Sequence, residues 1–577
     1  MLNLSSVVFS GTFTRILLGV FLLALRLPAA AQTPAWQSAR AVATATAAVA
    51  DNLSVVSATA VDAVGNVYLA GSFKNSVVLG GTTLTSLGDR DVFVAKFSPV
   101  SNQVVWAQRA GGTGSDYAAA LAVSGTSVYV VGSFSGAPAS FGTTILSNAG
   151  RTDAFVAKLV DAGPTGSFAW ALRAGGTESD NATALAVSGS GVYVGGHFSS
   201  PMVGFGSINL TSAGSYDVFV AKLTDAGTSG GFAWVQRAGG NNADFVSALG
   251  VSGNSLYVAG EFYGPTAVFG STTLVNANAS ASAGSSDVFV AKLVDVGLSG
   301  NFAWAERAGG LDLDYAAGLA VSGASVYVAG NFLSPTASFG PATLVNAGLN
   351  NADVFVAKLT DAGPTGGFAW AQRAGGAGED AATALAVSGT SVYIVGAFDS
   401  PTASFGANSL ASAGAFDAFA AKLVDAGSSG NFAWAQRAGG TGRDVAYELL
   451  LSGTSMYVAG AFASPTASFG AITLTNPTPN TNLGFLASLT DPTLTATAAG
   501  RVLNPAQLFP NPARRTATLR LPAGTPSAPL ILTDALGRAV RRYPAPAGPE
   551  TALDLNGLPA GLYLLRGAGP AQRLAVE

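Results

Sequence analysis

The stretch DVFVAKLTDAGPTGGFAWAQRAGGAGEDAATALAVSGTSVYIVGAFDSPTASFG, residues 353–406, decides the fold, because versions of it recur along the chain every 62 to 70 residues. A fixed period of this length is the signature of a repeat architecture. The repeat contains every tryptophan of the chain, and we align them all at one position: Trp36, Trp106, Trp170, Trp234, Trp304, Trp370 and Trp434. The sequence therefore predicts seven copies of one structural unit.

Each copy contains four short segments of strand character, which are rich in Val, Phe, Tyr and Trp and are bounded by turn residues. We call them A, B, C and D, and in the quoted copy they are residues 383–389, 391–398, 353–359 and 367–376, respectively. A Ser-Gly-Thr-Ser turn predicts a tight hairpin between A and B. The stretch between B and C predicts a second, projecting hairpin. It is marked by a Phe-Gly pair, whose phenylalanines are Phe141, Phe205, Phe269, Phe339, Phe405 and Phe469.

Four antiparallel strands in each of seven copies are typical of a β-propeller, in which the sheets, or blades, pack face to face around an axis. Packing on both faces of each blade explains the hydrophobic content of 49%. Segment A is rich in Ala, Gly and Ser, as expected where blades crowd near the axis. A linear solenoid is the alternative, and it would need capping repeats at its ends.

The two ends of the repeat region favour the closed propeller. A D segment around Trp36 precedes the first A segment, whereas the last copy ends in a degenerate C segment, residues 484–489, without a D segment after it. We therefore expect residues 34–42 to pair antiparallel with residues 484–489, and Trp36 to pack as the other tryptophans do. This pairing would remove two exposed sheet edges.

Composition and charge exclude several classes of function. The chain has no cysteine and a single histidine, which excludes disulfides, thiolate metal sites, a cysteine nucleophile and multi-histidine zinc sites. Residues 33–500 contain 17 Lys and Arg against 28 Asp and Glu, a net charge of −11, and residues 501–577 contain 9 against 4, a net charge of +5. The acidic main region argues against a nucleic-acid partner, because phosphate binding needs clustered Lys and Arg.

Residues 1–31 have the features of a secretory signal peptide. Arg15 precedes an apolar core over residues 16–25, and three alanines precede Gln32. No later apolar run approaches the ~20 residues that a membrane-spanning helix needs. We therefore expect an exported protein with no transmembrane segment in the mature chain.

Three further regions follow the signal peptide. We expect a seven-bladed β-propeller over residues 32–490 and a linker rich in Thr, Ala and Pro over residues 491–506. Residues 507–577 hold short alternating strands between Pro and Gly turns, which predict a small immunoglobulin-like β-sandwich.

The repeats contain the phrases Gly-Asn-Val-Tyr-Leu-Ala-Gly (65–71), Ser-Val-Tyr-Val-Ala-Gly (325–330) and Asp-Val-Phe-Val-Ala-Lys (287–292). In these phrases the repeat resembles the bacterial β-propeller repeats called SBBP repeats, and the resemblance covers residues 33–490. The family's Asp-x-x-Gly-Asn before Tyr is kept only at residues 62–66, and later copies have Ser-Gly instead. The resemblance implies the propeller fold.

The C-terminal region contains, in this order, Phe509-Pro-Asn-Pro512, Asp534-Ala-Leu-Gly-Arg538 and Leu558-Pro-Ala-Gly-Leu-Tyr563. In these phrases and in their order it resembles the sorting domain of type IX secretion. The resemblance implies a Gram-negative bacterium, passage through the periplasm, and export across the outer membrane by the type IX machinery. Surface attachment or release would follow. The matching residues are Phe509, Pro510, Asn511, Pro512, Gly537, Arg538, Leu558, Pro559, Gly561 and Tyr563.

One aspartate recurs just after each Gly-Gly, in the loop from D to A. Six converging carboxylates could form a ring at one mouth of the axis and hold calcium. The competing interpretation, which we favour, is that they form turns and bind the local backbone. In the first copy Asp51 and Asn52 lie near this position but not at it. The candidates are Asp116, Asp180, Asp244, Asp314, Asp380 and Asp444.

Two basic residues recur with equal regularity, and we expect them to pair with neighbouring carboxylates or to cap exposed edges. One is the lysine of segment C: Lys96, Lys158, Lys222, Lys292, Lys358 and Lys422. The other is the arginine of segment D: Arg109, Arg173, Arg237, Arg307, Arg373 and Arg437. The lone His197, in segment B, is expected to be structural, and no cofactor other than calcium is indicated.

The near identity of the copies favours a non-catalytic binding or adhesion module, exported to the cell surface or the medium as a monomer, with an unknown glycan or protein ligand. An extracellular polysaccharide hydrolase or lyase is the alternative, and it should gather unique acidic, His or Tyr residues in one or two blades. A structural component of a surface layer is a third possibility.

Overall fold

The computed structural model describes residues 34–45, 54–136, 138–280, 284–348, 350–494, 507–509, 512–520, 529–534, 538–546, 548, 550–567 and 569–576. This part of the chain is all-β and forms many small antiparallel sheets, with no α-helix among the described residues. Accordingly, nothing described here is a helix that is long and apolar enough to span a membrane.

Seven repeats follow one another, and in each the strands pair antiparallel in the order A-B-C-D. The A strands are β3 (Ser54–Val61), β9 (Asp116–Ser124), β15 (Asp180–Ser188), β21 (Asp244–Ser252), β27 (Asp314–Ser322), β33 (Asp380–Ser388) and β39 (Asp444–Ser452). The B strands are β4 (Val67–Phe73), β10 (Ser127–Ser135), β16 (Gly191–Phe198), β22 (Ser255–Tyr263), β28 (Ser325–Phe332), β34 (Ser391–Phe398) and β40 (Ser455–Phe462).

The C and D strands complete each unit. The C strands are β7 (Asp91–Ser98), β13 (Thr152–Asp161), β19 (Asp217–Asp225), β25 (Ser286–Asp295), β31 (Asp353–Asp361), β37 (Asp417–Asp425) and β43 (Leu483–Thr490). The D strands are β8 (Gln103–Gly111), β14 (Gly166–Gly175), β20 (Gly230–Gly240), β26 (Gly300–Ala308), β32 (Gly366–Gly375), β38 (Gly430–Gly439) and, for the seventh repeat, β1 (Ala35–Ala41).

The predicted hairpin between B and C is present and has a second function that the sequence does not reveal. Its first strand pairs with the end of the preceding repeat's D strand, as in Ala374 with Phe405. Each hairpin therefore links two repeats. The hairpins are β5 (Ser76–Leu79) with β6 (Thr82–Thr85), β11 (Ala139–Phe141) with β12 (Thr144–Leu146), β17 (Met202–Phe205) with β18 (Ile208–Thr211), β23 (Thr266–Phe269) with β24 (Thr272–Val275), β29 (Thr336–Phe339) with β30 (Ala342–Val345), β35 (Thr402–Phe405) with β36 (Asn408–Ala411) and β41 (Thr466–Phe469) with β42 (Ile472–Thr475).

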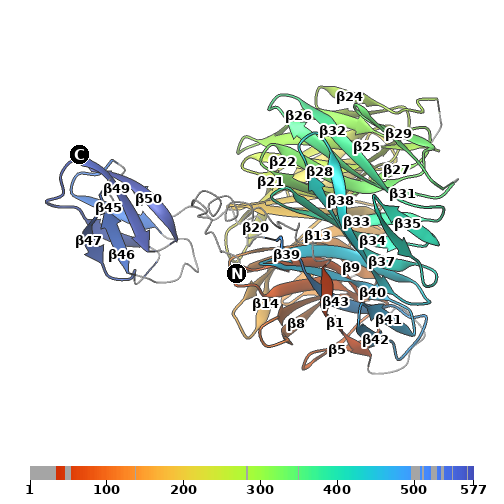
Figure 1. Cartoon of the computed structure of the whole chain (residues 1–577), viewed down its shortest axis with the longest axis horizontal. Helices are drawn as coiled ribbons and strands as arrows, with labels where there is room; N and C mark the ends of the chain where they lie inside the picture. The colour runs from red at the N-terminus through yellow and green to blue at the C-terminus, as the bar shows by residue number, and fades with distance from the viewer. Residues whose placement is uncertain are drawn as a thin grey trace, which may run out of the picture.

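The predicted pairing between the two ends of the repeat region is confirmed. β1 pairs antiparallel with β43 along its whole length, from Ala35 opposite Thr490 to Ala41 opposite Phe485. The short strand β2 (Thr44–Ala45) continues β1 and pairs with the hairpin strand β5 of the first repeat. Figure 1 shows β1 beside β43, although they lie at opposite ends of the repeat region.

The expectation that Trp36 packs as the other tryptophans do is wrong. In the other repeats the lysine of C lies opposite the tryptophan of D, as in Lys358 with Trp370. In the seventh repeat Ser488 is the equivalent of that lysine, and Ser38 lies opposite it. Trp36 is shifted by two residues and takes the place of the D-strand phenylalanine. It makes that residue's edge-to-face contact, at 5.3 Å between the ring centroids of Trp36 and Phe469.

The buried core lies between neighbouring repeats. Seven apolar clusters each combine side chains of two adjacent repeats, and one of them joins the last repeat to the first through Leu450, Leu486 and Val56. The A strands contact one another in chain order, and β39 also contacts β3. B and C strands are covered on both faces, which explains why runs such as Val67–Phe73 are buried throughout instead of alternating.

The C-terminal residues form two antiparallel sheets that share one buried cluster, which includes Leu519, Leu532 and Leu553. The first sheet contains β44 (Gln507–Phe509), β45 (Thr516–Arg520) and β48 (Glu550–Asp554). The second contains β46 (Leu530–Thr533), β47 (Ala539–Tyr543), β49 (Gly561–Gly567) and β50 (Gly569–Val576).

Candidate functional site

The six aspartates considered as a calcium ring each begin an A strand and are almost fully buried. Each accepts a hydrogen bond from the second glycine of the preceding Gly-Gly pair, as Asp380 Oδ2 does from Gly376 N at 2.6 Å. Asp380 Oδ2 also accepts the hydroxyl of Ser400, beyond the end of strand B, at 2.6 Å. These contacts tie the D-to-A loop to strand B, which is the turn-forming role. The other five make the first contact alike: Asp116, Asp180, Asp244, Asp314 and Asp444.

A second buried carboxylate lies beside the first glycine of the Gly-Gly pair. A Cβ on Gly375 would lie 2.2 Å from Asp353 Oδ1 and 2.8 Å from Asp380 Oδ2, and the residue has a φ of +135°. Glycine is therefore required there. Asp353 binds Arg373 at 2.8 Å, and every D-segment arginine makes this pair, as predicted: Arg109–Asp91, Arg173–Asp153, Arg237–Asp217, Arg307–Asp287, Arg373–Asp353 and Arg437–Asp417.

Burial raises the pKa of these A-strand aspartates, and in all of them except Asp444 the neighbouring carboxylate adds to the effect. The pKa of Asp314 rises to about 7 and that of Asp244 to about 8. The pKa of Asp116 and Asp380 rises to about 6. Asp244 and Asp314 therefore hold a proton, wholly or in part, at neutral pH, which weakens them as ligands for a cation.

The described residues contain no group of three or more His, Asp and Glu side chains that could hold a metal ion. In the first repeat Ser54 takes the position of the aspartate and accepts the N–H of Gly484 at 3.1 Å. Asp51 and Asn52, which lie near that position in the sequence, are outside the described residues. Calcium binding by these aspartates stays a prediction.

The C-segment lysines are buried between repeats, where each binds an aspartate at the end of the next repeat's C strand. Lys292 Nζ lies 2.7 Å from Asp361 Oδ2. The same carboxylate accepts hydrogen bonds from Tyr257 Oη at 2.5 Å and Trp304 Nε1 at 3.2 Å. The predicted pairing of the lysines with carboxylates is confirmed in Lys96–Asp161, Lys158–Asp225, Lys222–Asp295, Lys292–Asp361, Lys358–Asp425 and Lys422–Asp491.

This interface cluster is structural. Burial alone would raise the pKa of Asp361, but the hydrogen bonds from Lys292 and Tyr257 outweigh it and lower the pKa to about 2. A buried carboxylate that is ionised and fully hydrogen-bonded holds two sheets together without being available to a ligand. The regular charged residues of the repeat are thus occupied by the fold.

Residues that depart from the repeat include an aromatic group around His197. The ring centroid of His197 lies 4.9 Å from that of Phe245 and 5.7 Å from that of Tyr216, and Phe245 also contacts Tyr263. Burial lowers the pKa of His197 to about 4, so the ring is neutral at physiological pH. Glu261 has the position of His197 in the next repeat, and burial raises its pKa to about 8.

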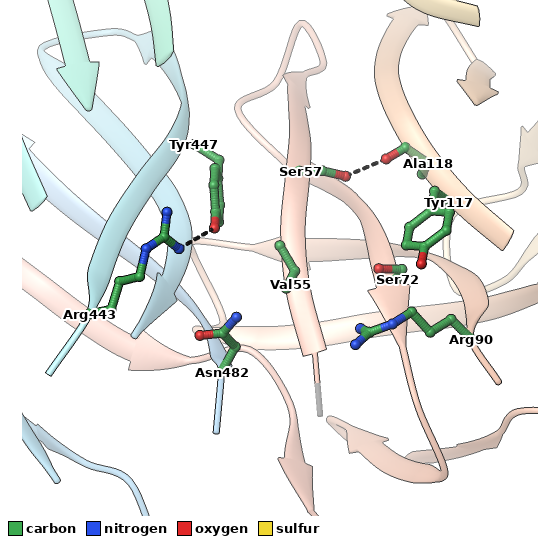
Figure 2. Close-up of a pocket in the computed structure, with 9 residues that line it drawn as sticks. All are labelled: Val55, Ser57, Ser72, Arg90, Tyr117, Ala118, Arg443, Tyr447 and Asn482. Carbon is green, nitrogen blue, oxygen red and sulfur yellow. Dashed lines mark hydrogen bonds between the residues drawn. The ribbon is translucent and has the colours of Figure 1, made fainter. Parts of the chain in front are cut away.

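A pocket of about 400 Å³ opens where the A strands of the seventh, first and second repeats begin. Figure 2 shows Arg443 and Arg90 on opposite sides of Val55. The described residues that line it include no acidic side chain, and they are Val55, Ser57, Ser72, Arg90, Tyr117, Ala118, Arg443, Tyr447 and Asn482.

Three of these residues, Arg443, Arg90 and Tyr447, have no counterpart of their type in the other repeats. The residues equivalent to Arg443 are Ser115, Ser179, Ala243, Leu313 and Glu379. The residues equivalent to Arg90 are Thr152, Tyr216, Ser286, Ala352, Phe416 and Asn482. The residues equivalent to Tyr447 are Ser57, Ala119, Thr183, Ser247, Ala317 and Thr383. Our sequence analysis did not single them out, although departure from the repeat was a usable signal.

The described sorting-motif residues lie at turns of the C-terminal sheets. Arg538 binds Asp534 through its backbone N at 2.9 Å and its Nε at 2.8 Å, between β46 and β47. Tyr563 Oη donates to Pro559 O at 2.7 Å, and Leu558 packs at the edge of the buried cluster. Gly561 begins β49 and Phe509 ends β44, whereas Pro512 is exposed. The motif positions outside the described residues are Pro510, Asn511 and Gly537.

No family model matches the chain. The chain is similar to regulatory protein FlaEY of Caulobacter vibrioides, with 28% identity over 353 residues, which are 58% of this chain and 35% of that protein. The match therefore spans about a third of the length of that relative.

Proposed function

We propose that residues 34–494 form a seven-bladed β-propeller that β1 closes. The cyclic contact among the A strands supports this proposal, because in a linear solenoid β3 and β39 would lie at opposite ends. The apolar cluster between the last and first repeats supports it as well. In the same way, the shared core of the two C-terminal sheets supports a β-sandwich.

The propeller serves as a binding module, and the pocket is the observation that carries this proposal. The recurrent charges are used within and between blades, whereas the arginines and Tyr447 of the pocket break the repeat at one mouth of the axis. Pockets of 300–1,000 Å³ with a few convergent polar groups are the usual form of ligand sites. Residues that break a repeat at such a place are more readily explained by a ligand than by the fold.

A binding screen tests this function. Residues 32–577 are applied to arrays of glycans and extracellular matrix proteins, together with the double variant Tyr117→Ala, Tyr447→Ala. We expect specific binding that the double variant loses while its melting temperature stays within a few degrees. Binding that survives the double variant, or none to any glycan or protein, contradicts a module that uses this mouth.

We further propose that the C-terminal sheets direct export through the type IX machinery. The proposal rests on the motif phrases and on their position at turns of a compact two-sheet region. A chain that ends at Asn504 should accumulate in the periplasm with its repeats folded. Equal surface display of the truncated and full-length chains would contradict the assignment.

An enzyme acting on polysaccharide is a second candidate, and the environment of Glu261 favours it. Its pKa of about 8 would let it act as a general acid near neutral pH, and Ser247 Oγ lies 3.2 Å from its carboxylate. Release of reducing ends from a polysaccharide, lost in Glu261→Gln, would support this function. The absence of any turnover by the wild-type chain would leave binding as the proposal.

A further inference from the structure

Glu261 is an enclosed acid for which the repeats supply no opposite charge. The buried aspartates of the C strands bind a lysine or an arginine, as Asp361 binds Lys292 at 2.7 Å. The carboxylate of Glu261 instead accepts one hydrogen bond, from Ser247 Oγ at 3.2 Å, and contacts no Lys or Arg among the described residues. The undescribed residues of the fourth and fifth repeats, 281–283 and 349, are Ala, Ser, Ala and Leu and carry no charge.

Glu261 lies near the end of β22, at a position that faces the A strand of the next repeat. In the fifth repeat the equivalent residue, Asn331, accepts the N–H of Ala382 from the sixth repeat at 2.7 Å through its Oδ1. Glu261 accordingly faces Tyr315, on β27 of the fifth repeat. The Glu261 side chain is half-buried, so a small ligand group can reach its carboxyl.

Aromatic rings and a second acid surround this carboxyl. A hydrogen bond links the side chains of Tyr315 and Tyr263. Burial and this bond raise the pKa of Tyr315, and the charges of Glu261 and Asp312 add to the effect. The ring centroid of Tyr263 lies 6.1 Å from that of Phe245, and all three aromatic side chains are half-buried. Two acids and exposed ring faces therefore meet around Tyr315.

Asp312, the second acid, also lacks a cationic partner among the described residues. Its Oδ1 accepts the N–H of Leu313 at 2.9 Å. At the equivalent position two repeats earlier, Glu178 binds Arg151 at 3.1 Å. Both acids depart from the repeat. The residues equivalent to Asp312 are Gly114, Glu178, Asn242, Gly378 and Gly442, and those equivalent to Glu261 are Ser72, Ser133, His197, Asn331, Ala397 and Ala461.

We propose that these residues bind a small organic diamine, with Glu261 as the partner of one ammonium group and Asp312 as the partner of the other. Carboxylate and hydroxyl oxygens accept the N–H groups of an ammonium, and aromatic faces attract its charge. A cation beside Glu261 favours the ionised carboxylate, so binding should release the Glu261 proton to the solvent. The site lies in other repeats than the pocket and does not depend on the pocket's ligand.

Isothermal titration of residues 32–577 with the diamine putrescine tests this proposal, with the neutral butanediol as the comparison ligand. We expect putrescine alone to bind, with a heat that depends on the ionisation enthalpy of the buffer because a proton is released. Glu261→Gln should lower the affinity by about tenfold or more and abolish this buffer dependence. Asp312→Asn should lower the affinity less and keep the buffer dependence.

Glu306→Gln is the matched control. Glu306 is another half-buried glutamate of the fourth repeat whose pKa is raised by burial, but it lies on β26, opposite Val290. This variant should bind putrescine as the wild type does. Melting temperatures verify folding, and the buffer dependence of the wild type remains a test if Glu261→Gln does not fold. Glutamine is the equivalent residue in other repeats, at Gln108, Gln236, Gln372 and Gln436.

Several outcomes would overturn the proposal. These are no binding of putrescine, equal affinity for butanediol, unchanged affinity in Glu261→Gln, or binding without proton release. Tighter binding of a lysine peptide or of a glucosamine tetramer would also overturn it, because the site would then belong to a macromolecular ligand. None of these results bears on the pocket, which the array screen with Tyr117→Ala, Tyr447→Ala tests separately.

Discussion

The closing interface between the seventh and first repeats differs from the other six. Each of those six buries a lysine on an aspartate of the next repeat, whereas at the closing interface the lysine position is Ser488 and the aspartate position is Pro99. Opposite Ser488, the tryptophan position is Ser38, and the two hydroxyls lie 2.7 Å apart. The lysine, the aspartate and the tryptophan of the cluster have been replaced together, whereas the tyrosine is kept as Tyr457.

The Arg–Asp pair within each of the other repeats is absent from the seventh repeat in the same coordinated way. Ala41 stands at the arginine position and Leu483 at the aspartate position. Breaking a buried ion pair by removing one partner leaves an uncompensated charge, while replacing both partners with apolar groups is often neutral. The charged partners of each pair are therefore kept or lost together, and apolar packing holds the interface between the seventh and first repeats instead.

Deleting the closing strand should have the largest effect on the protein. A chain without residues 34–45 lacks β1 and β2, so β43 and the hairpin β5–β6 lose their partners. We expect no stable monomer, because an exposed edge strand promotes association and the cluster around Trp36 is removed. Size-exclusion chromatography with light scattering measures this. A folded monomer with an unchanged melting temperature would contradict closure by β1.

At one of the six interfaces that contain the lysine and aspartate pair, removing the aspartate should have the next largest effect on stability. Asp361→Asn leaves Lys292 buried beside a neutral group, and the free energy of unfolding should fall by about 3–5 kcal/mol. The double variant Asp361→Asn, Lys292→Met should recover most of this loss, since no buried charge remains. Chemical denaturation measures both. Equal destabilisation by the single and double variants would show that the aspartate does not act through the lysine.

The closing interface allows the reverse experiment. Ser488→Lys places a lysine where Pro99 offers no carboxylate, and we expect a loss of about 3 kcal/mol. Adding Pro99→Asp should restore part of the stability. If Ser488→Lys leaves the free energy of unfolding unchanged in denaturation experiments, the joint replacement of lysine and aspartate at this interface has no effect on stability.

Substitution of two different glycines distinguishes the cost of an unfavourable φ from the cost of crowding by carboxylates. In Gly375→Ala the added Cβ would collide with two aspartate oxygens at an unfavourable φ. The free energy of unfolding should fall by about 3 kcal/mol. Gly389 has a φ of +59° with no atom within 4 Å of an added Cβ, so Gly389→Ala should cost about 1 kcal/mol. Thermal unfolding of both variants measures the difference. Similar losses would mean that the paired carboxylates do not crowd the loop.

The two sets of aspartates should give a pH profile of stability with two limbs. Interface aspartates such as Asp361 and Asp491, with pKa values of about 2, contribute stability that is present above about pH 4 and is lost as the pH falls towards 2. A-strand aspartates such as Asp314 and Asp244 keep their protons in the folded state up to about pH 7 and 8, while the unfolded chain releases them near its ordinary value of 3.8. Their contribution therefore falls as the pH rises from about 4 to 8.

The melting temperature should accordingly be highest between about pH 4 and 6. Asp244→Asn should flatten the alkaline limb and leave the acidic limb unchanged. A melting temperature that rises steadily from pH 5 to 8 would contradict the raised pKa values.

The sequence predicted the strands and their order, because each repeat supplies the same apolar pattern and turn residues. The prediction was wrong for Trp36, because the alignment by residue type placed this tryptophan in the same register as the others. Ser488 and Pro99 stand where the other interfaces have a lysine and an aspartate, and they allow a different register. It also missed the pairing of the B–C hairpin with the preceding repeat, which is a contact between units and has no periodic signal of its own.

The pocket could not be predicted from local pattern. Arg90 and Arg443 are 353 positions apart in the chain, and only the contact between the last and first repeats brings them to one cavity. The A-strand aspartates, by contrast, were visible from their spacing, and their contacts match the turn-forming role that the sequence favoured.

Ring closure by β1 is the central claim, and a single engineered disulfide tests it most directly. Ala39 lies opposite Ala487 in the β1–β43 ladder, and the chain has no cysteine of its own. Paired residues of this kind have Cα atoms within the range that a disulfide can bridge. Ala39→Cys with Ala487→Cys should oxidise to an intramolecular disulfide in nearly every folded molecule, seen as a mobility shift on non-reducing gels and by mass spectrometry. Free thiols, or disulfides only between molecules, would contradict the closed ring.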